Sequence, residues 1–94
     1  MIPYGTTEVP TGKYENNTFL RKVYIPDTVY SIGSKSFKGC TSLAEVEFLN
    51  PEKEGKLGIW HNAFEGCTNL YTITLPARLN YIHNGGFKDC LKLI

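Results

Sequence analysis

Residues 25–48 read IPDTVYSIGSKSFKGCTSLAEVEF, and the phrase Phe37-Lys38-Gly39-Cys40 inside them recurs at residues 64–67 and 87–90. The cysteines that end the three phrases lie 27 and 23 residues apart. A fixed phrase at a nearly fixed interval indicates an internal repeat of about 23 residues. Such repeats predict stacked coils, because one coil cannot bury its own apolar face and neighbouring coils share a core.

The repeat predicts a single domain, residues 1–94, built from the units 2–24, 25–47, 48–74 and 75–94. The third unit is four residues longer than its neighbours, and the polar stretch within 50–56 is the expected site of the insertion. Insertions in solenoids map to one face, so this stretch is interpreted as a solvated loop or, alternatively, as a partner contact.

Each unit contains one segment that alternates apolar and polar residues, at 20–25, 43–48 and 70–75. Alternation of this kind predicts a short strand with one buried face, which Pro26, Pro51 and Pro76 then end. The Phe-containing phrases are too short for a stable helix, so we expect turns of 3₁₀ or α character closed by a glycine. The predicted fold is an α/β repeat protein that is mostly β. It is a right-handed solenoid with one short parallel strand per coil and short turns on the return side.

The run Leu43-x-x-Val46-x-Phe48, followed by Ile59-x-x-x-x-Phe64-x-Gly66-Cys67-x-x-Leu70, resembles the unit of the BspA-like leucine-rich repeat family. The resemblance covers residues 2–94, and unit 25–47 matches it at nearly every anchor. It implies a leucine-rich-repeat solenoid that acts as a non-catalytic interaction module. It further implies a segment of a bacterial cell-surface or secreted protein that serves adhesion or partner binding.

Charge and hydropathy narrow the partner class. Ten Lys and Arg against nine Asp and Glu give a net charge of +1, without the basic stripe of a nucleic-acid binder. No apolar run approaches the ~20 residues of a membrane span, and the N-terminus lacks the features of a signal peptide. We therefore expect a protein or glycan partner, with no nucleic acid and no membrane insertion.

The two ends of the chain look uncapped. The chain enters at Ile2-Pro3 and stops at Leu91-Lys92-Leu93-Ile94, which reads as the start of another strand. Uncovered solenoid ends expose apolar core and unpaired strand edges. The expectation is a homo-oligomer formed through these ends, or continuation into further repeats.

Cys40, Cys67 and Cys90 are odd in number and form no CxxC pair, so neither a full disulfide framework nor a zinc site is expected. Their shared register predicts a ladder of buried thiols, with Asn17 at the equivalent place in the first unit. A less favoured alternative is a cysteine-dependent hydrolase that uses His61 or His83. These histidines do not share a register, and no spacing places either beside a cysteine. No catalytic, cofactor-binding or metal-binding residue is predicted.

The exposed positions of the strands are the predicted partner-binding residues: Lys22, Tyr24, Glu45, Glu47, Tyr71, Thr72 and Thr74. In a parallel stack Lys22 lies next to Glu45, and the tyrosines are the better recognition candidates because aromatic side chains with polar tips are enriched at interfaces. Tyr30, Trp60 and Tyr81 are expected to add aromatic surface on the return segments. The alternative is ordinary surface on a purely structural spacer.

Overall fold

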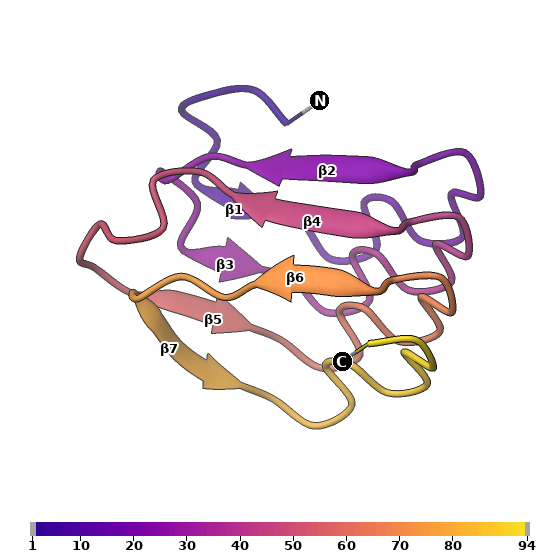
Figure 1. Ribbon diagram of the computed structural model, residues 1–94. Helices are drawn as coiled ribbons and strands as arrows, with labels where there is room; N and C mark the ends of the chain where they lie inside the picture. Colours follow the sequence, from indigo (N-terminus) through magenta and orange to yellow (C-terminus); the bar gives the residue numbers. More distant parts are fainter. Residues whose placement is uncertain (1, 94) are drawn as a thin grey trace.

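The chain folds into a stack of flattened coils with a strand on each broad side (Figure 1). The computed structural model describes residues 2–93. Met1, which belongs to the expected domain, and Ile94, which belongs to the expected final strand, lie outside them. One sheet consists of β2 (Lys22–Ile25), β4 (Glu45–Phe48) and β6 (Thr72–Thr74). The other consists of β1 (Glu8–Val9), β3 (Ser31–Ile32), β5 (Leu57–Ile59) and β7 (Leu79–Ile82).

All neighbouring strands pair in parallel, and the chain winds as a right-handed coil (Figure 1). Lys22 pairs with Glu45, which pairs with Thr72, and these steps of 23 and 27 residues match the sequence repeat. In the other sheet Ile59 pairs with Ile82, again 23 residues away. The mostly-β solenoid predicted from the repeat is confirmed, and the four additional residues lie between β4 and β5.

The second sheet is a feature that the expectation of one strand per coil did not include. Its inward positions are held by the β-branched residues Val9, Ile32 and Ile59, which are 0–2 % exposed. Two of its strands are only two residues long. Two residues give no alternation to detect, so only the stacking of equivalent residues makes these segments strands.

The return bends are hydrogen-bonded turns, and residues 2–93 contain no helix. The bends contain bonds between residues three apart, as from the Cys40 N–H to the Phe37 carbonyl at 3.1 Å, but the expected 3₁₀ or α character is not confirmed. Every bend contains two positions with positive φ, which interrupt a right-handed helical path. One set is Gly12, Lys35, Asn62 and Gly85, and the other is Asn16, Gly39, Gly66 and Asp89. The second set explains the recurring phrase, because Gly, Asn and Asp tolerate the left-handed region best.

Aromatic rings run through the core as a continuous column. The ring centroids are 5.3 Å apart for Tyr14 and Phe37, 5.1 Å for Phe37 and Phe64, and 5.3 Å for Phe64 and Phe87. The bends that carry these rings also bond across coils, since the Phe37 N–H donates to the Ala63 carbonyl at 2.8 Å. Equivalent residues thus sit directly over one another along the stack.

Ser36 is a buried polar residue in this core. It is 0 % exposed, and its Oγ has no hydrogen-bond partner among residues 2–93. The equivalent residue of the next coil is the fully buried Ala63. We expect Ser36→Ala to raise the free energy of unfolding by about 1 kcal/mol, because it removes an unsatisfied buried hydroxyl.

Urea denaturation at constant m-value measures this gain. The matched control is Ser42→Ala, at a half-buried position, which is expected to change stability by less than about 0.5 kcal/mol. A Ser36→Ala protein less stable than the parent contradicts the assignment.

Candidate functional site

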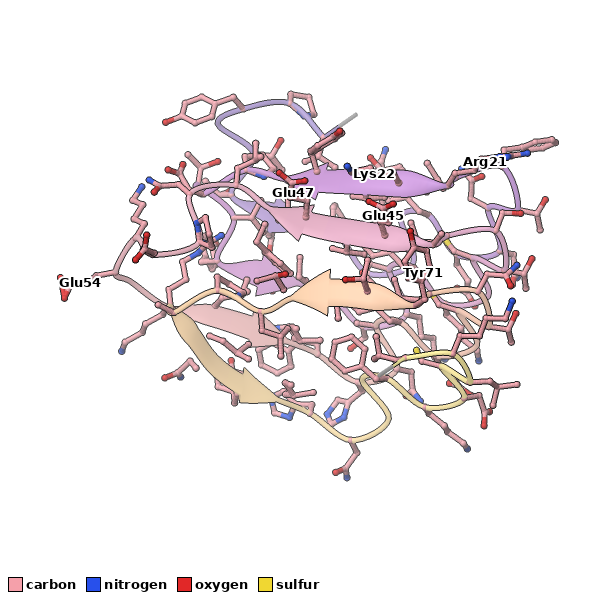
Figure 2. The ribbon with its side chains drawn as sticks, in the orientation of Figure 1. Arg21, Lys22, Glu45, Glu47, Glu54 and Tyr71 are labelled. Carbon is pink, nitrogen blue, oxygen red and sulfur yellow. The ribbon has the colours of Figure 1, made fainter. Side chains whose placement is uncertain are left out.

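The outer face of β2, β4 and β6 gathers the predicted partner-binding residues (Figure 2). Strand alternation turns Val23, Val46 and Ile73 toward the core and the residues on either side of them outward. The parallel register then aligns the outward residues in two columns. One column contains Lys22, Glu45 and Thr72, and the other contains Tyr24, Glu47 and Thr74. Tyr71 precedes β6 at the same edge, so the structure brings all seven residues onto one face.

Five of these residues form a connected group, called here the sheet-face cluster: Lys22, Tyr24, Glu45, Glu47 and Tyr71. The Lys22 ammonium lies 3.3 Å from Glu45 Oε2 and 3.5 Å from Glu47 Oε1. The same ammonium lies 4.7 Å from the centroid of the Tyr24 ring. The Tyr71 hydroxyl donates to Glu45 Oε1 at 2.9 Å. Sequence reasoning anticipated the contact of Lys22 with Glu45 and missed the diagonal contact with Glu47.

These contacts change the protonation behaviour of the cluster. The Tyr71 hydrogen bond and then the Lys22 charge lower the pKa of Glu45. The pKa of Tyr71 is raised by the hydrogen bond that its hydroxyl donates to Glu45. The pKa of Lys22 is raised by Tyr24 and, to a smaller extent, by Glu45. All three groups keep their pH 7 charge states. Exposed ion pairs add little stability, so the main effect of the contacts is to orient the side chains.

Tyr71→Phe is expected to raise the pKa of Glu45 toward its ordinary value of 4.5. The substitution removes the hydroxyl that favours the carboxylate, and leaves the ring and Lys22 in place. In the parent the folded-state pKa is below the unfolded one. The associated stability is therefore present above pH 4.5 and is lost as the pH falls through the folded-state pKa.

A carbon-13 NMR titration of the Glu45 carboxyl measures this pKa directly. Tyr4→Phe removes a hydroxyl from a side chain that is 79 % exposed, and it is expected to leave the titration of Glu45 unchanged. Equal Glu45 midpoints in Tyr71→Phe and the parent would show that the bond is not formed in solution.

The insertion lies beside the sheet-face cluster, not over it. Figure 2 places Glu54 on the loop after β4, at the far end of the face from Arg21. Asn50 Nδ2 donates to Asp27 Oδ2 at 3.1 Å, and Lys53 Nζ lies 3.7 Å from the same oxygen. The longer coil is thus tied to the preceding one at its corner.

The cysteines form the predicted ladder. The thiols of Cys40, Cys67 and Cys90 donate to the carbonyls of Tyr14, Phe37 and Phe64 at 3.1–3.2 Å. Burial raises the pKa of all three, and the proximity of Cys40 and Cys90 helps to raise that of Cys67 to about 12. A catalytic cysteine needs the opposite shift, because the thiolate is the nucleophile.

We expect native Cys67 to react with a disulfide reagent at pH 7 far more slowly than the same thiol in urea, because it is buried and carries its proton. Mass spectrometry of peptides after timed labelling resolves the three sites. Cys90, which is only partly buried, is expected to label first. Rapid native labelling of Cys67 would instead favour the hydrolase alternative.

His61 and His83 lie on the outer side of the other sheet, among aromatic rings. Their ring centroids are 4.7 Å apart, although they occupy different registers. His83 stacks on Trp60 at 4.4 Å with an interplanar angle of 13°, and Tyr81 meets Trp60 edge-on at 5.5 Å. Sequence reasoning expected aromatic surface at Trp60 and Tyr81 but missed the two histidines beside them. Pairing Ile59 with Ile82 makes Trp60 and His83 equivalent, and that register was the available signal.

Within residues 2–93, no three His, Cys, Asp or Glu side chains gather where they could hold a metal ion. No helix there has the length and apolar character to cross a bilayer.

Comparison with known proteins gives one result. A family model described as BspA type leucine-rich repeat region matches residues 7–94, in six copies. No curated protein and no solved structure reaches a reliable match. The residues that the family model matches include every strand of both sheets.

Proposed function

Because the chain belongs to the BspA-type leucine-rich repeat family, we propose that it is a protein-binding module whose outer face of β2, β4 and β6 contacts the partner. Proteins of this family are generally surface-associated, and its repeats generally act as non-enzymatic interaction modules. The proposed setting is a bacterial cell-surface or secreted protein, and the proposed task is adhesion or partner binding.

The orientation of the sheet-face cluster is the observation that carries this proposal. Lys22 contacts three neighbours and Glu45 uses both carboxylate oxygens, so these exposed side chains are ordered before a partner arrives. Side chains that are already ordered lose less conformational entropy on binding. Tyr71, which is 48 % exposed, and Tyr24 supply the aromatic contact area that binding hot spots favour.

Charge suggests what the partner presents to this face. The cluster contains one ammonium and two carboxylates. Glu45 is engaged at both oxygens, whereas the side chain of Glu47 is 53 % exposed and touches Lys22 through one oxygen. A partner arginine or lysine would therefore pair with Glu47, with an apolar or aromatic contact at Tyr71.

Adhesion of coated beads to cultured epithelial cells tests the proposal. Beads carrying the parent chain are expected to adhere above albumin-coated beads. Beads carrying Tyr24→Ala, Glu47→Ala and Tyr71→Ala together should lose adhesion by about fivefold or more, because central aromatic contacts dominate interface energies. The matched control combines Lys13→Ala, Glu15→Ala and Phe19→Ala, at exposed positions of the return bends.

Equal adhesion of the parent and the triple variant would contradict a binding role for this face. That outcome is the one expected of a purely structural spacer.

A further inference from the structure

A groove is lined by residues in and next to the strands of the sheet opposite the sheet-face cluster, the sheet of β1, β3, β5 and β7. It has a volume of about 540 Å³, within the range of small-molecule sites. Its walls include three aromatic side chains, Tyr30, Trp60 and Tyr81. Tyr30 is 54 % exposed and Tyr81 is 39 % exposed, so aromatic surface remains open to a ligand.

Trp60 is the largest side chain that lines this groove. The strand register makes Pro10, Gly33, Trp60 and His83 equivalent residues of successive coils. Trp60 stacks one indole face on His83, at 4.4 Å. The coil on its other side carries Gly33, on which the backbone of residues 9–11 packs closely, since a Cβ there would lie 2.5 Å from the Val9 carbonyl oxygen. Pro10, Gly33 and Trp60 all line the groove, so the indole borders it.

In the core, rings of adjacent coils stack at centroid distances of 5.1–5.3 Å. A ring bound in the groove against the indole would stack at a similar distance. The position of Tyr81 is fixed beside it. A Cβ on Gly58 would lie 2.8 Å from the Tyr81 ring, so the ring packs directly over that glycine.

The remaining lining is rich in hydroxyl groups. Thr11, Ser31 and Ser34 each supply a group that both donates and accepts hydrogen bonds, and Glu8 supplies a carboxylate that only accepts. Hydroxyl groups that both donate and accept, beside aromatic rings, suit a polyol. Glu8 disfavours anionic ligands by charge. It also disfavours a proline-rich peptide, whose free polar groups are carbonyl acceptors.

We propose that this groove binds a pyranose unit of a neutral glycan. The apolar C–H face of the sugar stacks on the indole of Trp60, and its hydroxyl groups bond to Glu8, Ser31 and Ser34. The site is independent of the sheet-face cluster, because the two lie on opposite sheets.

Trp60 is the single tryptophan of the chain, so its fluorescence reports on this site alone. The probes are cellotetraose, chitotetraose, xylotetraose and mannotetraose, each titrated to about 10 mM, at which a low-millimolar site is mostly occupied. At least one is expected to change the emission of Trp60 in a saturable way, while decaproline leaves it unchanged. The proposal is overturned if none of the four sugars changes the emission of Trp60, or if decaproline alone changes it.

Calorimetry with the responding sugar locates the site. Tyr30→Ala and Tyr81→Ala are each expected to weaken binding by about two- to tenfold, the contribution of one aromatic contact, and Trp60→Ala by at least as much. Tyr4→Ala is the matched control, because Tyr4 is 79 % exposed and lies outside the groove lining. Equal affinity of Tyr81→Ala, Trp60→Ala and the parent would place the sugar elsewhere and overturn the assignment.

Discussion

Phe64→Ala is expected to lower the free energy of unfolding by about 3–5 kcal/mol, the largest effect of any single substitution considered for this chain. Phe64 is 0 % exposed and stacks at 5.1 Å on Phe37 and at 5.3 Å on Phe87. The loss combines the transfer of a large apolar side chain with a cavity in the middle of the ring column. Small domains are stable by only about 5–15 kcal/mol, so a large part of the margin disappears.

Urea unfolding followed by circular dichroism measures this loss. The chain supplies its own control, since Phe19 is 90 % exposed and Phe19→Ala is expected to change stability by less than about 0.5 kcal/mol. If Phe64→Ala and Phe19→Ala lower the free energy of unfolding equally, the rings do not form the shared column on which the fold depends.

Gly33→Ala is expected to destabilise the protein by about 1–3 kcal/mol. A Cβ at this position would lie 2.5 Å from the Val9 carbonyl oxygen and 2.8 Å from the Thr11 nitrogen. Both atoms belong to the backbone, so β1 and β3 must separate to admit it. The separation stretches the hydrogen bond from the Gly33 N–H to the Val9 carbonyl, which measures 2.8 Å. The entropy that alanine removes from the unfolded chain offsets only about 0.4–1 kcal/mol of this cost.

The midpoint of unfolding in urea, which should fall, measures this destabilisation. Hydrogen exchange of the backbone amide at residue 33 is expected to become faster. Ser34→Ala changes the adjacent, half-buried residue and is expected to leave both measurements nearly unchanged. A Gly33→Ala protein as stable as the parent would mean that the first two coils are less closely packed than described.

The repeated phrase was enough to predict the stack and its register. Because Phe37, Phe64 and Phe87 recur with Cys40, Cys67 and Cys90 at a constant offset, one alignment placed both the ring column and the thiol ladder. The outward strand residues followed from the same alignment by alternation. Periodicity over the whole chain constrains a solenoid far more than local propensity does.

The features that escaped prediction depend on contacts between coils and not on the pattern within one. The two-residue strand Ser31–Ile32 has no sequence signal of its own and exists because β1 and β5 flank it. Lys35 adopts the same left-handed conformation as Gly12 and Asn62, although lysine, unlike glycine and asparagine, is not a residue type that favours it. Aromatic surface was expected at Tyr30, Trp60 and Tyr81, but the groove that they line is formed by several coils together and not by the pattern within one.

The cross-coil bonding of the bends has a consequence for how such a chain can change length. Equivalent backbone groups of neighbouring coils are hydrogen-bonded to each other. The Tyr14 N–H donates to the Ser36 carbonyl, and the Phe37 N–H donates to the Ala63 carbonyl. An in-frame duplication or deletion of one whole 23-residue stretch would therefore leave matching surfaces at the new junction. The tolerated extra residues between β4 and β5 show that spare length is accommodated at a corner. Evolution can thus lengthen or shorten this architecture by whole turns without redesigning its interior.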